Sequence, residues 1–436
     1  MIVSCTTASC DACGARHPAR YERDGQRVDF VVDCPRGAVR IPVSDDAGLF
    51  LDFRARSTVD PAKPSPHGAW RHNNVIEITR ACDCACPFCY SRTPESDDAS
   101  HVPADDVVAI ARRVRAEGGY AVSLGGGEPL YHPAFDSIVR RIRDLGLQVQ
   151  VLSNGLRLGC DPGLARRLKR LGVATVTVQF DTLNPATQQR YRGTDGLAAK
   201  RAAMRHCTAA GLRLCAAVVV SRHNIEELRA VVDALLPFAP NLFLISLQCL
   251  WLPGDAPVAG FGREDLVCKE AVVRALCGGE DAAGVGRLVP ADFWPLPAFA
   301  PLRLNIHPDC GVFAVLCRTR GGWQPVGAFV DLPGLFRSMA AAGSAGRSSP
   351  AAGMLCLGRL VLRHGRTGMR WALTRALGGV LRGCGRAGAV ALAVEHLSAA
   401  ACQDEQRTCR CATVLRTMHG DGQRGCFANR RTGESA

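Results

Sequence analysis

Three closely spaced cysteines have the residue type and spacing of a metal-binding loop. Cys82, Cys86 and Cys89 follow the pattern C-x3-C-x2-C, with Phe88 directly before the last thiol. A closed [4Fe–4S] cluster takes four thiolates, one for each iron. Three thiolates leave one iron open, and an open iron can bind a small chelating ligand and pass it an electron. The alternative is a structural zinc knot or a set of buried thiols.

The segment around these cysteines, residues 77–90, resembles the cluster loop of the radical S-adenosylmethionine (SAM) superfamily. The resemblance implies that the amino and carboxylate groups of SAM chelate the open iron. One-electron reduction would then split SAM into methionine and a 5′-deoxyadenosyl radical, which abstracts hydrogen from an organic substrate. The resemblance also implies a flavodoxin- or ferredoxin-type electron donor. Phe88 is expected to pack against the cluster or the adenine.

A second motif lies further along the chain, where Gly126, Gly127 and Glu128 match the GGE motif of the same superfamily. Glycines let a backbone approach a ligand closely, and a carboxylate can accept a hydrogen bond from the ammonium group of SAM. A glycine-rich turn after a strand is common in proteins. The motif therefore indicates SAM binding only in combination with its place in the predicted fold.

Five further polar residues are assigned to SAM or substrate by the resemblance, and each has a structural alternative. Ser153 and Asn154 contact the ribose or carboxylate of SAM, or they cap the next turn. Asp181 reaches the ribose or the substrate, or it is a solvated loop carboxylate. Arg192 pairs with the SAM carboxylate, or it lies on the surface of this arginine-rich chain. Asn224 touches SAM, or it fixes its loop as a helix N-cap.

The elements that must position these residues alternate between short apolar runs and helical stretches. The expected strands are 75–79, 120–124, 148–152, 175–180, 212–220 and 242–247, and the expected helices are 104–117, 133–145, 162–171, 196–210 and 224–238. This alternation predicts βαβ units in a parallel sheet. Six repeats make an α/β fold, a partial (β/α)6 TIM-like barrel, which the resemblance also implies. The motifs fall at the carboxyl ends of the strands, where barrels place their chemistry.

We expect three domains. Residues 1–65 form a small cysteine-containing, metal-knuckle-like module, residues 66–252 form the barrel, and residues 253–436 form a cysteine-rich C-terminal extension. Within the extension, residues 338–353 are expected to be a flexible linker or exposed loop.

Cysteines near the N-terminus suggest a mononuclear metal site. Cys10, Cys13 and Cys34 combine a CxxC knuckle with a distant cysteine, a pattern of zinc or rubredoxin-like iron sites. A tetrahedral site needs a fourth ligand. The sequence leaves it open, with Cys5 and His17 as candidates.

A further group lies toward the C-terminus. Cys310, Cys411 and Cys426, with Cys402 and Cys409 nearby in the sequence of the tail, are expected to hold an auxiliary Fe–S cluster that relays electrons or binds substrate. The alternative is an assortment of buried and solvent-facing thiols.

The two ends of the chain resemble a particular group of the superfamily, which contains archaeal tetraether lipid synthase and the pterin-methylating radical SAM enzymes. The resemblance lies in the CxxC…CP-x-G start, in residues 307–311 and in residues 411–429. The chain departs from that group at two places. Arg36 stands where the group usually has a histidine, and residues 397–401 replace the polar stretch that precedes the C-terminal cysteines of the group. The resemblance implies methylation or alkylation of an unactivated carbon, or another carbon–carbon bond formation.

Two alternatives remain open. One is a peptide-modifying radical SAM maturase with an auxiliary cluster in its tail, which would be expected to carry a leader-binding module at the N-terminus. The other is a non-catalytic iron–sulfur electron carrier, which would neither bind nor cleave SAM.

Composition limits the partners. The net charge of +13 over 436 residues comes from arginines spread along the chain, with four lysines in all, so we expect no nucleic-acid partner. No apolar run approaches the roughly 20 residues of a membrane span, and no signal peptide is evident. We expect a cytoplasmic protein, in which 22 cysteines more often bind metal than form disulfides.

Overall fold

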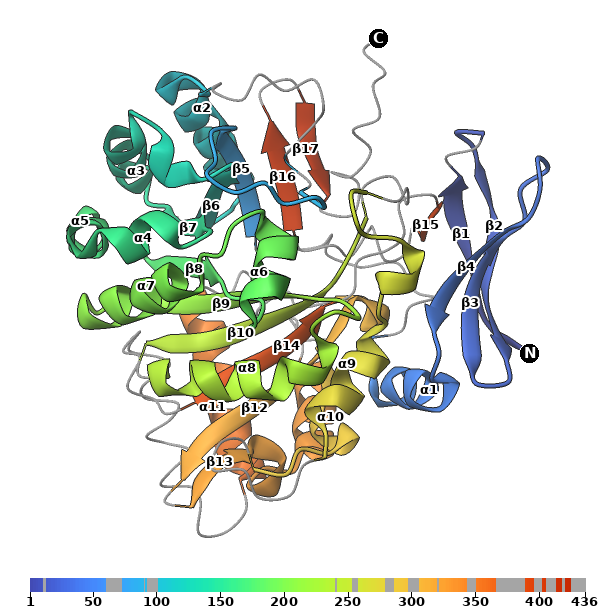
Figure 1. Cartoon of the computed structure of the whole chain (residues 1–436). Coiled ribbons are helices and arrows are strands. Elements are labelled where there is room, and N and C mark those ends of the chain that lie inside the picture. Colours follow the sequence, from blue (N-terminus) through green and yellow to red (C-terminus); the bar gives the residue numbers. More distant parts are fainter. Residues whose placement is uncertain are drawn as a thin grey trace. The chain divides into compact units, whose positions relative to one another are not determined.

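The computed structural model describes residues 1–10, 13–59, 73–89, 91, 101–239, 241–252, 258–278, 286–296, 306–319, 321–342, 350–365, 389–395, 402–404, 413–417 and 420–424. The chain divides into two compact units, each built from segments far apart in sequence (Figure 1). The central unit comprises Arg71–Val219, Trp251–Asp265 and Ala412–Ala436. The flanking unit comprises Met1–Trp70, Val220–Leu250 and Leu266–Cys411.

The central unit contains a parallel sheet whose strands alternate with helices. Its strands are β5 (Asn73–Thr79), β6 (Ala121–Gly126), β7 (Gln148–Ser153), β8 (Thr175–Gln179) and β9 (Arg213–Val220), and each pairs in parallel with the next. The helices between them are α2 (Ala104–Ala116), α3 (Phe135–Asp144), α4 (Leu156–Cys160), α5 (Pro162–Leu171), α6 (Pro185–Arg192) and α7 (Leu197–Ala209). The predicted α/β class with a parallel sheet is thus confirmed.

Two strands from the C-terminal part of the chain extend this sheet. β16 (Thr413–Thr417) pairs in parallel with β5, and β17 (Gly420–Arg424) pairs antiparallel with β16. The sheet therefore continues on the far side of the strand that leads into the cluster loop (Figure 1).

Helix α5 shows why the sequence folds as predicted here. The Asp161 side chain caps its first turn by accepting a hydrogen bond from the Gly163 N–H, and Gly172 ends it at φ +74°, where glycine is favoured. Between the caps, Leu164, Leu168 and other apolar residues at helical spacing are buried. Each buried leucine contributes roughly 1.5–3 kcal/mol.

The flanking unit begins with an antiparallel sheet. Its strands are β1 (Ile2–Cys10), β2 (Arg16–Asp24), β3 (Arg27–Val32) and β4 (Val39–Ser44), and β15 (Cys402–Asp404) lies beyond β1. Helix α1 (Ala47–Arg56) follows, and its Phe50 belongs to the same core as Tyr21 and Phe30. The small cysteine-containing N-terminal part is present, and it is built on this sheet.

A second group of strands in the flanking unit joins distant segments. β10 (Leu242–Cys249), the sixth predicted strand, pairs in parallel with β14 (Ala389–Glu395), and β14 pairs antiparallel with β12 (Gly311–Thr319). β11 (Trp294–Pro295) and β13 (Gly322–Pro325) also pair with β12. The helices of this unit beyond α1 are α8 (Leu228–Leu235), α9 (Lys269–Leu276), α10 (Leu332–Ala341) and α11 (Pro350–His364).

The expected linker at 338–353 was wrong at both of its ends. Residues 338–341 form the last turn of α10, where Met339 is buried, and residues 350–353 begin α11. The Asp331 side chain caps the start of α10 by accepting from the Gly334 N–H. Small residues here continue a packed helix instead of ending it.

The three predicted domains, 1–65, 66–252 and 253–436, stay predictions.

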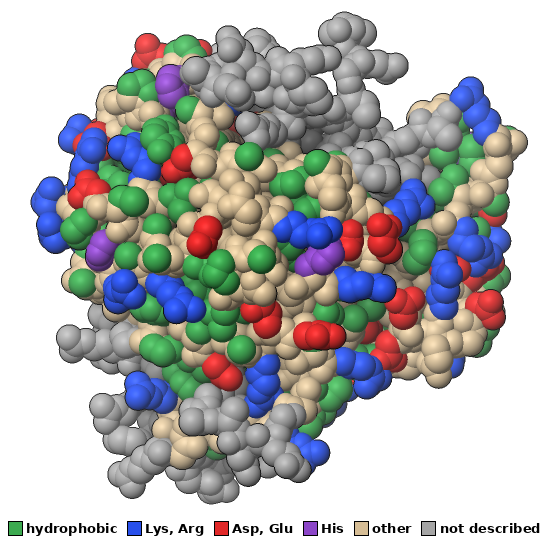
Figure 2. All heavy atoms as spheres, in the orientation of Figure 1, with side chains coloured by type: hydrophobic (Ala, Val, Ile, Leu, Met, Phe, Trp, Pro, Cys, Tyr) green, Lys and Arg blue, Asp and Glu red, His purple; other side chains and the backbone are tan. Residues whose placement is uncertain are grey.

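Two surface properties bear on possible partners. On the face drawn in Figure 2, the Lys and Arg side chains among the coloured residues are scattered, and several lie near Asp or Glu. Within the described ranges, no helix is at once long enough and apolar enough to cross a membrane.

Candidate active site

The cluster loop leaves the carboxyl end of β5 and is held from two sides within the central unit. The Gly127 N–H donates to the Thr79 carbonyl at 2.7 Å, and the Glu128 N–H donates to the Ala81 carbonyl at 2.8 Å. From the other side, the Ala85 N–H donates to the Arg192 carbonyl at 2.8 Å. The GGE turn after β6 and the end of α6 thus fix the backbone that carries the three cysteines.

The two glycines of the GGE motif are required because the GGE turn packs closely against the cluster loop. Gly126 has φ +112°, and a Cβ there would lie 2.4 Å from the Thr79 carbonyl oxygen. A Cβ on Gly127 would lie 2.4 Å from the Ala81 carbonyl oxygen. Any larger residue would push the loop away. The backbone that these glycines approach is that of the cluster loop, and their predicted contact with SAM stays a prediction.

The first cysteine of the loop lies beside Asn154. The Asn154 amide donates to Cys82 Sγ at 3.8 Å and to Asp83 Oδ1 at 2.5 Å. Cys84 is a buried thiol near Cys82, and one ligand atom from each of Cys82, Asp83 and Cys84 lies within 4.8 Å of the others. Hydrogen bonding from Cys84 lowers the pKa of Cys82 to about 7, against the opposing effect of burial. The thiolate form of Cys82 is therefore accessible near neutral pH.

The second cysteine lies beside a buried arginine. Arg192 Nη1 donates to Cys86 Sγ at 3.4 Å, while its other nitrogens donate to both oxygens of Asp181 at 2.7 and 2.8 Å. Hydrogen bonding from Cys84, supported by the Arg192 charge, lowers the pKa of Cys86 to about 5. Burial raises the pKa of Cys89 to about 11, so this thiol needs a metal to lose its proton near neutral pH.

Asp181 and Arg192 form a fully buried ion pair. Asp181 also accepts from the Val219 N–H, and despite burial the Arg192 charge holds the pKa of Asp181 below its usual value. The surface alternative for Arg192 and the solvated alternative for Asp181 are therefore both wrong, because both side chains are buried. Neither residue's role toward SAM is tested by this geometry.

Glu128, Ser153 and Asn154 meet at the ends of β6 and β7. The buried Glu128 carboxylate accepts from the Ser153 hydroxyl at 3.1 Å, the Asn154 N–H at 2.8 Å and the Leu130 N–H at 3.3 Å. Burial nevertheless raises the pKa of Glu128 to about 8. The structure thus joins the GGE motif to the predicted Ser153–Asn154 pair in one network.

Phe88 belongs to an aromatic cluster. Its ring contacts Tyr191 and Phe261 edge to face, with centroids 5.5 and 5.1 Å apart, and the Arg192 guanidinium lies 5.3 Å from its centroid. Such contacts fix the side chain that precedes the last cysteine.

Lys200 on α7 was missed by the sequence analysis. It is fully buried, and its Nζ has no hydrogen-bond partner among the described residues. Burial lowers the pKa of Lys200. The Arg192 charge lowers it further, whereas Asp181, Cys84 and Cys86 oppose this shift. Two signals were present: the chain has four lysines, and this one falls on the face of residues 197–209 that also carries Leu197 and Met204.

Two predicted sites fall elsewhere. Asn224 belongs to the flanking unit, where its side chain accepts from the Ser221 N–H at 2.9 Å, and its predicted contact with SAM stays a prediction. Of the predicted auxiliary cluster, Cys310 follows the buried Asp309 and ends a short 3-10 helix, Pro308–Cys310, directly before β12. Cys411 and Cys426 lie outside the described residues, so the auxiliary cluster stays a prediction.

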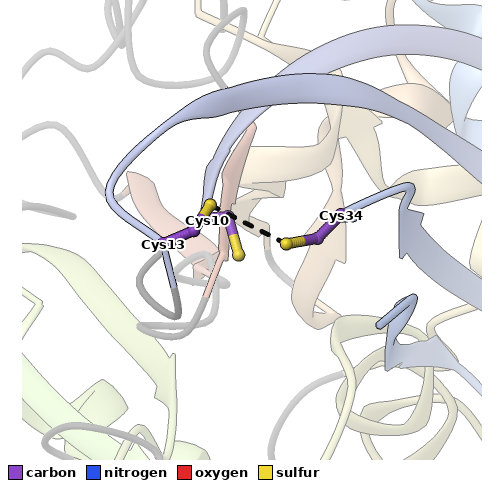
Figure 3. Close-up of side chains that lie close together, drawn as sticks. All are labelled: Cys10, Cys13 and Cys34. Carbon is purple, nitrogen blue, oxygen red and sulfur yellow. Dashed lines mark hydrogen bonds between the residues drawn. The ribbon is translucent and has the colours of Figure 1, made fainter. Parts of the chain in front are cut away.

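The predicted N-terminal metal ligands converge. The Sγ atoms of Cys10, Cys13 and Cys34 all lie within 4.8 Å of one another, and Cys34 and Cys13 are 3.7 Å apart (Figure 3). His17 Nε2 lies 2.9 Å from Cys13 Sγ, and this hydrogen bond lowers the pKa of Cys13. Cys5 is exposed, whereas Cys10 is buried on the same strand. An odd separation places the two on opposite faces, which argues against Cys5 as a ligand.

Comparison with known proteins agrees with this site. Residues 76–235 match the model of the Radical SAM superfamily, so this part of the chain is a radical SAM domain. The chain is 31% identical over 174 residues to a PqqA peptide cyclase of Streptomyces rochei, which covers 40% of this chain and 46% of that one. The chain thus spans about half of that relative's length.

A second relative matches over a longer stretch. The 7,8-dihydro-6-hydroxymethylpterin dimethyltransferase of Methanocaldococcus jannaschii is 24% identical over 368 residues, covering 76% of this chain and 71% of that one. Among solved structures, Streptococcus suis SuiB matches with a TM-score of 0.37 at 18% identity, over 45% of this chain and 42% of that one.

Proposed function

We propose that this chain is a radical SAM enzyme that methylates or alkylates an unactivated carbon of an organic substrate, or forms a carbon–carbon bond in another way. One observation carries the choice of reaction. The likeness to the pterin dimethyltransferase runs over 368 residues, far beyond the domain at 76–235, whereas the likeness to the peptide cyclase ends after 174.

The cluster loop suits a [4Fe–4S] cluster on Cys82, Cys86 and Cys89. Two of its thiols have lowered pKa values, and the third, Cys89, is partly buried, which raises its pKa. When bound, the cluster supplies the electron for reductive cleavage of SAM. A flavodoxin- or ferredoxin-type protein is the proposed source of that electron.

Arg192 and Asn154 are proposed to tune the two sulfurs they contact. Hydrogen bonds to cluster sulfurs stabilise the more negative, reduced state and orient the ligands. Asp181 holds the Arg192 guanidinium by two hydrogen bonds, so this donor is positioned before any cofactor binds. The Asn154 side chain is likewise fixed, because its oxygen accepts from the Leu156 N–H at 2.9 Å.

Glu128 and Lys200 are proposed to contact the charged groups of SAM or substrate. Glu128 is the acceptor that the GGE resemblance assigns to the SAM ammonium, and Ser153 holds its carboxylate in place. Lys200 offers a buried positive charge without a hydrogen-bond partner among the described residues, which suits a carboxylate brought in by a ligand. Asn224 remains a proposed SAM contact.

Additional metal sites belong to the same proposal. Cys10, Cys13 and Cys34 would hold a zinc or iron ion, and Cys310, Cys411 and Cys426 would hold an auxiliary Fe–S cluster. The cytoplasm is the proposed location, because a reducing compartment keeps so many free thiols unoxidised.

A peptide-modifying maturase is the second candidate, and the peptide cyclase favours it through its 31% identity. The two candidates differ in where the methyl group of SAM goes. We would incubate the reconstituted, reduced enzyme with methyl-labelled SAM and a small-molecule extract of the organism that carries this chain. Label in a non-peptide product is expected. A peptide that loses two hydrogens, with no label transferred, would instead support the maturase.

A further inference from the structure

The N-terminal site has three thiols at the spacing of a tetrahedral metal site. Four sulfurs about 2.3 Å from one metal ion lie about 3.8 Å from each other. Cys13 and Cys34 Sγ are 3.7 Å apart, and Cys10 Sγ lies within 4.8 Å of both. Tight turns hold two of these residues: the Cys10 N–H donates to the Ala15 carbonyl, and the Cys34 carbonyl accepts from the Gly37 N–H. The geometry needs one more ligand.

The sheet brings a fourth cysteine to this place. β15 pairs antiparallel with β1, with Cys402 directly opposite Cys10 and Gln403 opposite Ser9. Residues directly opposite each other on an antiparallel pair have Cβ atoms about 4.5–5.5 Å apart. A register slip of one residue would put Gln403 opposite Cys10 instead. The observed register therefore places a cysteine of the C-terminal part beside the first ligand of the N-terminal knuckle.

We propose that Cys402 completes a closed four-thiolate site with Cys10, Cys13 and Cys34, which binds zinc or iron as a structural ion. The inference deepens the mononuclear site in the proposed function, and it is independent of SAM chemistry. A site with four protein ligands leaves no open position for a substrate. It fastens the strand at Cys402–Asp404 to the N-terminal sheet.

His17 is the competing fourth ligand, and distance argues against it. In a tetrahedral site, an imidazole nitrogen about 2.1 Å and a sulfur about 2.3 Å from the metal lie about 3.6 Å apart. His17 Nε2 is 2.9 Å from Cys13 Sγ, which suits a hydrogen bond to the sulfur. His17 therefore orients and stabilises a ligand thiolate, as outer partners of metal sites commonly do.

The test uses cobalt bound to the full chain in which the cysteines of both proposed clusters, Cys82, Cys86, Cys89, Cys310, Cys411 and Cys426, are alanine, so that neither cluster absorbs. Co²⁺ replaces zinc, and the intensity of its thiolate charge-transfer band rises with the number of thiolates. We expect four-thiolate intensity, a loss of about a quarter of it in Cys402→Ser and none in His17→Gln. Cys5→Ser, on the opposite face of β1, is the matched control and should change nothing.

A second measurement avoids the risk that a variant fails to fold. The same chain with zinc bound is treated with iodoacetamide and digested for mass spectrometry, before and after chelation. We expect Cys402 to be protected together with Cys10, Cys13 and Cys34, and all four to be alkylated after chelation. Alkylation of Cys402 while the other three stay protected, or cobalt intensity lost in His17→Gln and kept in Cys402→Ser, would overturn the proposal.

Discussion

Buried ionisable side chains surround the cluster loop at close range. Glu128, Asp181, Arg192 and Lys200 are all nearly inaccessible to solvent, and only Asp181 and Arg192 form an ion pair with each other. Burying charge without full pairing costs stability. Such a cost is reasonable where a charged ligand is to bind, and it makes each of these residues separately testable.

The first prediction concerns Glu128, whose pKa is raised from 4.5 to about 8. Between these values the folded chain holds a proton that the unfolded chain has released, so stability falls as pH rises. Glu128→Gln cannot titrate. In the wild type, Glu128 should make the free energy of unfolding fall by up to about 1.4 kcal/mol per pH unit. In urea unfolding of the metal-free protein from pH 5 to 8, this contribution to the slope should be absent from the variant.

The exposed Glu226 provides the control for this measurement. Glu226→Gln should keep the slope of the wild type. An unchanged slope in Glu128→Gln would show that the carboxyl group titrates normally in the folded chain, and the account of its burial would be wrong.

The second prediction concerns Lys200. Lys200→Met removes a buried amino group that has no hydrogen-bond partner among the described residues, and burying a polar group without a hydrogen bond costs roughly 1–3 kcal/mol. We expect the urea midpoint of the metal-free protein to rise. If Lys200 binds a carboxylate of SAM, the affinity of the reconstituted enzyme for SAM should fall at least about tenfold, or 1.4 kcal/mol.

Lys169→Met is the matched control, because Lys169 is exposed and its Nζ donates to a surface carbonyl, that of Gly211. It should alter neither quantity strongly. Loss of stability in Lys200→Met with unchanged SAM affinity would mean that Lys200 has a purely structural role.

At the scale of elements, the GGE turn and the cluster loop form one packed piece. Gly127→Ala places a methyl group 2.4 Å from the Ala81 carbonyl oxygen and 2.7 Å from that of Arg80. Overpacking of this kind costs roughly 1–3 kcal/mol, and here it displaces the loop that carries the ligands. We expect the iron and sulfide bound after reconstitution to fall well below the wild-type level.

Gly358→Ala is the control for this substitution, because a methyl group there meets nothing within 4 Å. It should leave the iron content unchanged. Full cluster loading in Gly127→Ala would show that the loop does not depend on this close approach.

The helices and strands of the central unit could largely be predicted from the sequence. Their signals are local: buried strands with β-branched residues, capped helices and apolar residues at helical spacing. The short helices α4 and α6 were missed, because α4 has five residues and α6 carries mostly polar ones. β14 alternates small and larger apolar residues, but its pairing with β10 joins segments far apart in sequence, and no local pattern fixes such a pairing.

The same distinction holds for the site. Cysteine spacing and the GGE motif are local patterns, and they suffice to identify the loop and its supporting turn from the sequence. The Arg192–Asp181 pair, the contact of Asn154 with Cys82 and the burial of Lys200 depend on side chains from different elements. Each residue type is compatible with several roles until the fold brings its neighbours together.

At the scale of the whole molecule, the two units are interleaved in sequence. The flanking unit takes up the start of the chain and most of its second half. The central unit takes up a long block, Arg71–Val219, a short one, Trp251–Asp265, and the last residues. The proposed Cys402 ligand fits this arrangement, because it would join residues 10 and 402 within one unit. Cross-links that close long loops restrict the unfolded chain most strongly.

The central claim is that the loop of Cys82, Cys86 and Cys89 supports reductive cleavage of SAM. The most direct test reconstitutes the protein anaerobically with iron and sulfide, reduces it with dithionite, adds SAM and measures 5′-deoxyadenosine. The Cys82→Ala, Cys86→Ala, Cys89→Ala variant is treated in parallel, with Cys160→Ala as a control for loss of an exposed thiol. We predict 5′-deoxyadenosine from the wild type and from the control, and none from the triple variant. A wild-type protein that binds no cluster, or a triple variant that forms as much 5′-deoxyadenosine as the wild type, would contradict the account.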